Sequence, residues 1–228
     1  MKWLIVLFFS PALLAADLHG VQVQGSCDIK VVPDRGSVSF TTENQSKDQQ
    51  VSVKSTNQQM NDLKEKIQKL KLKDVEFKTT NYHVYPVREY EKDHYVDKGT
   101  KVTMTMEITT SEIARLGEAM LEASKAKIQI VGQMVTFLSL EKSQAEYLKC
   151  LDVAANDARK KADQLAKKLG FKVGDVKNLI ESPAQISAPV PIYAKSMMTN
   201  SLRGAEAPPV EAGTQNFSTN IQVTFEIK

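Results

Sequence analysis

Residues 147–176 read YLKCLDVAANDARKKADQLAKKLGFKVGDV, and the spacing of small and apolar residues in this stretch decides the fold. These residues recur at the period of an α-helix, while Lys and Asp occupy most of the remaining positions. The predicted buried stripe consists of Leu151, Ala154, Ala155, Ala158, Ala162, Leu165, Ala166 and Leu169. Gly170 supplies the left-handed conformation that ends such a helix. The alanines predict a helix that lies close against a sheet, with Leu165 in the core.

The rest of the chain alternates between strand and helix patterns. A turn at Pro33 and Asp34 separates two predicted strands, because Pro fixes φ and Asp can accept a hydrogen bond from the backbone two residues on. Helices are predicted from Lys47 to Leu70 and after Ser111, where Ser111 can act as the N-cap. Further strands are predicted at 75–88, 101–109, 127–138, 173–181 and 215–227, with an exposed hairpin tip at 89–99. The predicted class is α+β, with mixed or antiparallel strands packed with two or three long amphipathic helices.

The N-terminus, MKWLIVLFFSPALLAAD, has the layout of a secretory signal peptide. One lysine precedes an apolar run that is too short for a transmembrane helix, and small residues follow. We expect cleavage after Ala16, which leaves a mature chain at 17–228 without a transmembrane or lipid anchor. Its length suits one domain or two small ones. The predicted location is the periplasm or the exterior of a bacterial cell.

Charge and cysteine content narrow the function further. Loss of Lys2 with the signal peptide lowers the formal charge from +3 to +2, and the basic run Lys64 to Lys73 fits a solvated helix face, so no nucleic-acid partner is expected. Cys27 and Cys150 are the only two cysteines. Export to an oxidising compartment permits a bridge between them, but two unpaired, half-buried thiols fit the sequence equally well.

Residues 183–213 are rich in Pro, Ala and Ser and show no periodicity. Such a length inside a compact domain indicates a functional loop, an arm or disorder. Because Ile192, Tyr193, Met197 and Met198 are unsuited to a solvated linker, one interpretation is an arm that packs on a neighbouring subunit. Disorder is the other.

No set of residues indicates an active site. His83, Glu91, Asp93 and His94 are metal-ligand types near the hairpin, but their spacing matches no compact motif, so we expect no metal and no cofactor. The sequence has no G-x-S-x-G elbow, phosphate-binding loop, H-E-x-x-H or paired-cysteine motif. We therefore expect no catalytic residues and a protein that is not an enzyme.

Three segments resemble the SIMPL-domain family of YggE-like envelope proteins. They are VQGSCDIKVVPDRGSVSF at 23–40, AANDARKKADQLAKKLGFKVGDV at 154–176 and VEAGTQNFSTNIQVTFEIK at 210–228. Within them, the resemblance marks Pro33, Asp34, Ala154, Ala158, Ala162, Leu165 and Gly170 as structural residues. The chain departs from the family at Cys27 and Lys127, where glycine is common, and at Thr100, which follows Gly99 where tyrosine is common.

The resemblance implies an α+β domain that is secreted to the bacterial envelope. It also implies ring-like or channel-like homo-oligomers and stress-related roles. The strand edges, the Pro-rich segment and the signal peptide fit a protein with a structural role, which associates with itself or with other envelope proteins. The resemblance carries over no catalytic residue. The alternative is a periplasmic ligand- or metal-binding module.

Overall fold

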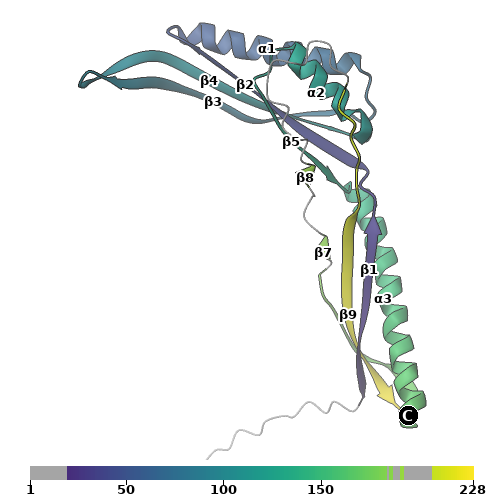
Figure 1. Cartoon of the computed structure of the whole chain (residues 1–228). Helices are drawn as coiled ribbons and strands as arrows, with labels where there is room; N and C mark the ends of the chain where they lie inside the picture. Colours follow the sequence, from purple (N-terminus) through teal and green to yellow (C-terminus); the bar gives the residue numbers. More distant parts are fainter. Residues whose placement is uncertain (1–19, 184, 187–190, 193–206) are drawn as a thin grey trace, which may run out of the picture. The chain divides into compact units, whose positions relative to one another are not determined.

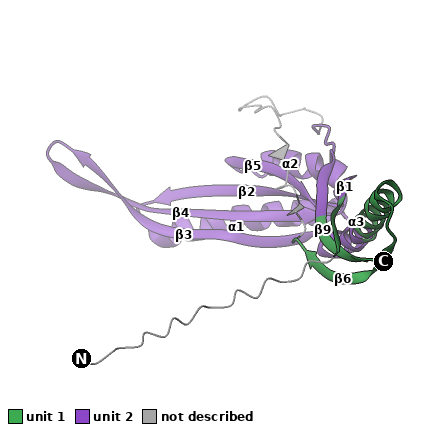
Figure 2. Ribbon diagram, turned by 90° about the horizontal axis from the view of Figure 1, so that it is seen from below, with its two compact units in different colours: residues 1–26, 152–183, 220–228 green, residues 27–151, 184–219 purple. Residues whose placement is uncertain are grey.

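The computed structural model describes residues 20–183, 185–186, 191–192 and 207–228. The predicted signal peptide at 1–16 and most of the segment 183–213 lie outside these residues. The chain divides into two compact units, shown in Figure 2. Unit 1 contains residues 1–26, 152–183 and 220–228, and unit 2 contains residues 27–151 and 184–219. The family-based expectation of one domain at 17–228 stays a prediction.

The elements follow an α+β order, as the sequence predicts (Figure 1). In chain order they are β1 (Val21–Val31), β2 (Arg35–Ser46), α1 (Gln49–Lys69), β3 (Glu76–Glu91), β4 (His94–Thr110), the 3₁₀ turn η1 (Ile113–Arg115), α2 (Leu116–Lys125), β5 (Ile130–Phe137), α3 (Leu140–Leu169), β6 (Val173–Glu181), β7 (Gln185–Ile186), β8 (Pro191–Ile192) and β9 (Gln215–Ile227). The unit boundary falls within β1, α3 and β9, so these three elements contribute to both units.

Unit 2 contains a sheet of order β3-β4-β2-β5-β8, in which every pairing is antiparallel. Helices α1 and α2 lie on the same face of this sheet (Figure 1). Alternate residues of β2 and β4, such as Val38, Phe40 and Ile108, point into a core that also includes Leu63 and Ile67 of α1. The period-2 pattern of the strands and the period-3.6 pattern of the helix therefore meet in one apolar layer.

Helix α1 begins at Gln49, two residues later than the predicted start at Lys47, and the buried residues of its first turns are polar. Asp48 is the N-cap, and its side chain accepts a hydrogen bond from the Gln50 N–H at 2.8 Å. Ser52 and Thr56 are buried, whereas Val53 is only half-buried. The Ser52 hydroxyl donates to the carbonyl of Thr100 at 2.8 Å, so hydrogen bonds satisfy this polar part of the interface.

The segment before α2 differs from its prediction. Ser111 does not cap a helix, because its hydroxyl bonds to a carboxylate oxygen of Asp74 at 2.9 Å and the chain first makes the η1 turn. Helix α2 ends in a Schellman motif: the Lys127 N–H donates to the Ser124 carbonyl and the Ile128 N–H to the Ala123 carbonyl, both at 3.0 Å. Lys127 has a φ of 59°, so it holds the left-handed position that glycine usually takes.

Strands β3 and β4 are longer than predicted. The segment expected to form an exposed hairpin tip is mostly strand, and only Lys92 and Asp93, with φ values of 43° and 66°, form the turn. Strand β2 ends where Ser46 pairs with Thr100, so the remaining part of β4 pairs with β3 alone. Figure 1 shows this two-stranded ribbon projecting beyond the end of β2.

Unit 1 packs one helix face against the sheet β1-β9-β6. The buried residues of α3 in this unit are Ala154, Ala158, Ala162 and Ala166, which form one row at intervals of four residues. Gly25 of β1 lies directly against this row, since a Cβ atom placed there would come within 2.0 Å of the Ala154 carbonyl oxygen. After Leu169, Gly170 adopts a φ of 80° and ends the helix, as predicted.

Candidate interaction surfaces

The structure confirms burial for some of the residues that the sequence singled out and contradicts it for Leu165. Pro33 is buried, and Ala154, Ala158 and Ala162 have no exposed surface. Cys27 and Cys150 form a disulfide, which decides between the two states that the sequence left open. Leu165 was predicted to lie in the core, and this prediction was wrong: Leu165 is 42% exposed. The predicted buried stripe was also wrong at Ala155 and Leu169, which are both exposed. The buried row repeats every four residues, so Leu165, which belongs to the adjacent row, stays at the helix edge.

Asp34 acts beyond the local turn. Its carboxylate accepts hydrogen bonds from Ser139, from the N–H at 2.7 Å and from the hydroxyl at 2.6 Å. Ser139 in turn caps α3, because its hydroxyl oxygen accepts the Lys142 N–H at 3.2 Å. Partial burial acts to raise the pKa of Asp34, but the hydrogen bonds from Ser139, a bond from the backbone of Asp34 itself and the charge of Lys142 together hold the pKa below its usual value. Asp34 therefore positions the start of a helix far along the chain.

The hairpin residues considered as metal ligands do not form one cluster. His83 pairs with Thr103, whereas Glu91 pairs with His94 beside the turn. His83 and Glu91 are eight positions apart on one extended strand, a separation of about 26 Å at ~3.3 Å per residue. Glu91 instead binds the amino group of Lys98 at 2.5 Å. Within the described part of the chain, no three His, Cys, Asp or Glu side chains are grouped to hold a metal ion.

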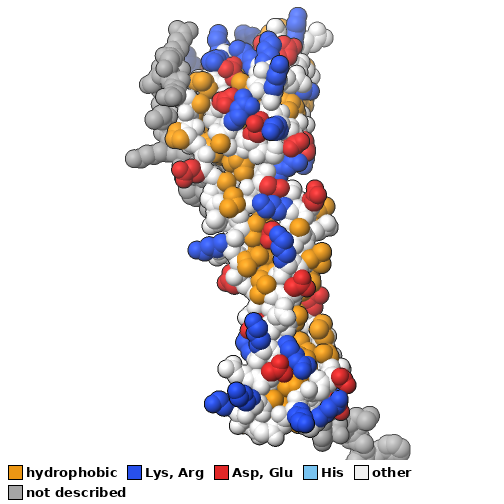
Figure 3. Space-filling view, turned by 90° about the vertical axis from the view of Figure 1, so that its right-hand side faces the viewer, with side chains coloured by type: hydrophobic (Ala, Val, Ile, Leu, Met, Phe, Trp, Pro, Cys, Tyr) orange, Lys and Arg blue, Asp and Glu red, His pale blue; other side chains and the backbone are white. Residues whose placement is uncertain are grey.

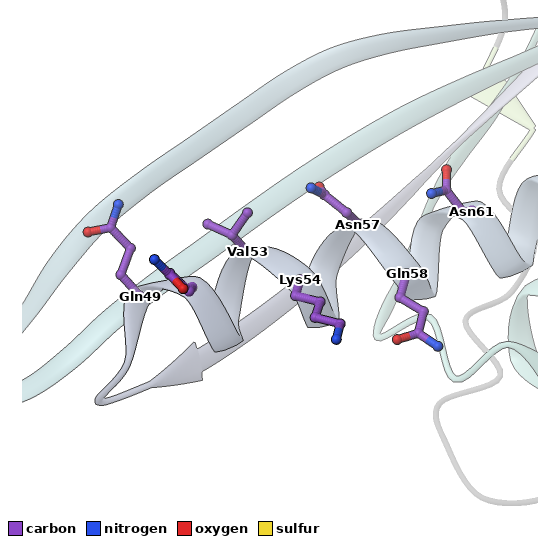
Figure 4. A pocket seen from close by; sticks show the side chains of 7 residues that line it. Gln49, Val53, Lys54, Asn57, Gln58 and Asn61 are labelled. Atoms are coloured by element: carbon purple, nitrogen blue, oxygen red, sulfur yellow. The ribbon is translucent and has the colours of Figure 1, made fainter.

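A hollow of about 730 Å³ lies along the start of α1, and Figure 4 shows the side chains that line it. The lining residues are Gln49, Gln50, Val53, Lys54, Asn57, Gln58 and Asn61. All come from one helix, and most are neutral amides. The hollow thus offers hydrogen-bond donors and acceptors, but Lys54 is its single titratable lining residue, which is a poor basis for acid–base chemistry.

Among the described residues of unit 2, strand β3 has the most exposed aromatic side chains. It lies at the edge of its sheet, and Tyr82, Val84, Tyr85 and Tyr90 are all exposed. In the ribbon, Tyr90 faces its cross-strand partner Tyr95 with ring centroids 5.2 Å apart, and these two residues are 63% and 72% exposed. An exposed edge strand with large apolar side chains is a surface on which another chain can pair.

A second edge, the outer edge of β1 in unit 1, is occupied by side chains of α3. The Ser26 N–H donates to the Asp157 carboxylate at 2.9 Å, and the Lys161 amino group donates to the Gln24 carbonyl at 2.8 Å. Asp157 and Lys161 also pair with each other at 2.6 Å. The hydrogen bond from Lys161, together with that from the Ser26 N–H, lowers the pKa of Asp157.

The spacing of Asp157 and Lys161 predicts an ion pair between residues four apart on the helix, which is confirmed, but it does not predict their bonds to β1, and the sequence pattern gave Gly25 no role. A glycine inside an alternating strand was the available signal, because it often marks a close approach of another backbone. The remaining surface of α3 carries both charge signs: Figure 3 shows basic, acidic and hydrophobic side chains interspersed over it. None of the helices in the described ranges is long and apolar enough to cross a membrane.

Comparison with known proteins gives the family of this chain. The chain matches the SIMPL family, described as a protein of unknown function (DUF541), over residues 21–225. It therefore belongs to the SIMPL family. It is also similar to a protein named "Uncharacterized protein YggE" from Edwardsiella ictaluri (strain 93-146), with 22% identity over 210 residues that cover 91% of this chain and 86% of the relative.

Proposed function

We propose that this chain is a secreted protein of the bacterial cell envelope that works without catalysis, by assembling with further copies of itself. The observation that carries the proposal is the open edge of β3, where Tyr82, Val84, Tyr85 and Tyr90 are exposed along one strand. Single exposed apolar residues are ordinary on a monomer, but a row of them on an unpaired edge favours association. A ring-like or channel-like assembly is the form that the family resemblance favours.

Two further features support an envelope location. The N-terminal residues 1–16 have the pattern of a signal peptide, and the bridge between Cys27 and Cys150 is of a kind that persists in oxidising compartments. A stress-related or structural role is the one that the family resemblance favours for such an exported protein. Recovery of a chain that begins at Asp17 from a periplasmic fraction tests export, and comparing the envelope-stress tolerance of cells with and without the chain tests the role.

Self-assembly is tested by measuring the mass of residues 17–228 in solution by light scattering at micromolar concentration. We expect a multiple of the monomer mass. Tyr82 and Val84 lie on one face of β3, where they pair with Met104 and Val102 of β4. The double variant Tyr82→Lys/Val84→Lys places two charges on this edge strand, which should weaken pairing with another chain and shift the measured mass toward that of the monomer. Val51→Lys, at an exposed apolar position of α1, is the matched control and should leave the mass unchanged. A strict monomer in all three proteins would favour the ligand-binding alternative.

A further inference from the structure

The outer edge of β1 is matched to α3 by the geometry of the two elements. Asp157 and Lys161 are four residues apart on the helix, and their partners Ser26 and Gln24 are two residues apart on the strand. Four helical residues rise about 6.0 Å and two strand residues span about 6.6 Å. Because the two spacings are nearly equal, side chains four residues apart on the helix can each reach one of the outward backbone groups of the edge strand.

The two side chains have the chemistry that a neighbouring strand would offer. A carboxylate is an acceptor and meets the Ser26 N–H, whereas an ammonium group is a donor and meets the Gln24 carbonyl. A paired strand would supply one carbonyl and one N–H at the same places. Asp157 and Lys161 thus bond to the backbone groups of Ser26 and Gln24, to which another strand would otherwise bind.

The same row of α3 is apolar on both sides of this ion pair. At intervals of four residues it runs through Val153, Asp157, Lys161, Leu165 and Leu169. Val153, Leu165 and Leu169 are 49%, 42% and 72% exposed. They flank the β1 edge and would gain cover from an element added there.

β1 is complementary to itself in an antiparallel register centred on Ser26. Val23 would then lie opposite Ile29 on the side that faces α3, and Gln24 would lie opposite Asp28 on the other side. Gln22 would lie opposite Lys30, so no like charges would oppose each other in this register. This complementarity makes β1 of a second copy a suitable occupant.

We propose that the outer edge of β1 is a strand-addition site that Asp157 and Lys161 hold closed, and that it accepts β1 of a second copy of this chain. The inference rests on the proposed function in taking a second copy as the partner, but it uses a different edge from β3. The guarding pair can open, because both side chains are partly exposed and such pairs are weak and screened by salt.

The test compares variants of residues 17–228 by light scattering over a range of concentrations. The double variant Asp157→Ala/Lys161→Ala should gain a concentration-dependent species of twice the mass of the wild-type particle. Arg159→Ala/Asp163→Ala removes another ion pair of α3 with the same spacing, so it should behave as wild type. Asp157→Asn/Lys161→Gln keeps an acceptor and a donor at the two positions, and it should also stay closed.

Hydrogen exchange by mass spectrometry locates the new contact and separates this proposal from assembly through β3. In the opened variant, amides of residues 22–28 should become more protected as concentration rises, while those of residues 82–85 should match wild type. If the wild type is monomeric and the opened variant dimerises, assembly through β3 is rejected and the β1 proposal is kept. The β1 proposal is overturned if the opened variant keeps its fold by circular dichroism but shows the wild-type mass, if protection appears elsewhere, or if the control pair gives the same dimer.

Discussion

Lys127 holds a backbone position that favours glycine. Its φ of 59° is left-handed, and it directly follows Ala126, the C-cap residue of α2. A side chain with a Cβ atom is strained in this region by roughly 1–3 kcal/mol, whereas glycine is not, although glycine loses more entropy on folding. We predict that Lys127→Gly raises the free energy of unfolding by about 1 kcal/mol.

Urea unfolding followed by circular dichroism measures this effect, because the single tryptophan of the chain, Trp3, lies in the predicted signal peptide. Lys125→Gly is the matched control, since Lys125 is the last residue of α2. Glycine at that position should lower stability by about 0.5–1 kcal/mol. Equal effects of the two substitutions would contradict a specific role for the backbone conformation at Lys127.

Asp34 should contribute a pH-dependent part of the stability. Its folded-state pKa is held below the ordinary 3.8 by the hydrogen bonds from Ser139, so the contribution is complete above that value and disappears as pH falls through the folded pKa. We predict that Asp34→Ala lowers the free energy of unfolding by about 2 kcal/mol at pH 7, in the range for hydrogen bonds to a charged group. The gap between wild type and variant should narrow as pH falls below the ordinary value; a gap independent of pH would argue against a charged Asp34.

At the scale of elements, the contact between α3 and β1 in unit 1 depends on the absence of a side chain at Gly25. Gly25→Ala would bring a Cβ atom within 2.0 Å of the Ala154 carbonyl oxygen, a backbone atom that cannot rotate away. We predict a loss of about 3 kcal/mol, at the upper end of overpacking effects. Leu165→Ala removes more atoms from a half-open site and should cost less than about 1 kcal/mol. Thermal unfolding of both variants checks the order, and a larger loss for Leu165→Ala would place Leu165 in the core after all.

The sequence predicted elements well where apolar residues contrast with polar ones. The end of α3 at Gly170 and the strand β9 are confirmed because a glycine stop and strict alternation are local signals. The length of β3 and β4 was missed because the ribbon is exposed on both sides, and polar residues on both faces leave no periodicity to read.

The candidate surfaces were harder to predict than the elements. A helical period of 3.6 groups Leu165 with the alanines, and only contact with a twisted sheet selects the row at intervals of four as the buried one. The guarding of β1 by Asp157 and Lys161 joins residues more than a hundred positions apart, and a single sequence carries no signal for that pairing. For the same reason, the sequence could not show that Cys27 and Cys150 are bridged.

For the whole molecule, the disulfide coincides with the division into units. The continuous part of unit 2 spans residues 27–151, and the bridge joins Cys27 to Cys150 at its two ends. It therefore closes nearly all of that segment into one covalent loop, with a sequence separation of 123 residues. The same unit also holds the chain that returns from residue 207, because Val210 packs against its core. The described end of the predicted arm at 183–213 thus contacts its own chain.

Because the loop is long, its closure should restrict the unfolded chain more than it strains the folded one. The chain-entropy treatment gives about 4–5 kcal/mol as an upper value for a loop of this length, and measured losses are typically about 2–5 kcal/mol. We predict that Cys27→Ala/Cys150→Ala lowers the free energy of unfolding of residues 17–228 by about 3 kcal/mol, measured by urea unfolding. Alanine avoids placing hydroxyl groups at two buried positions. Reductant should destabilise the wild type by a similar amount and leave the variant unchanged, since only the wild type has a bridge to lose. If reductant destabilised both proteins equally, the effect could not be assigned to the bridge, and the link between the disulfide and the closure of unit 2 would be rejected.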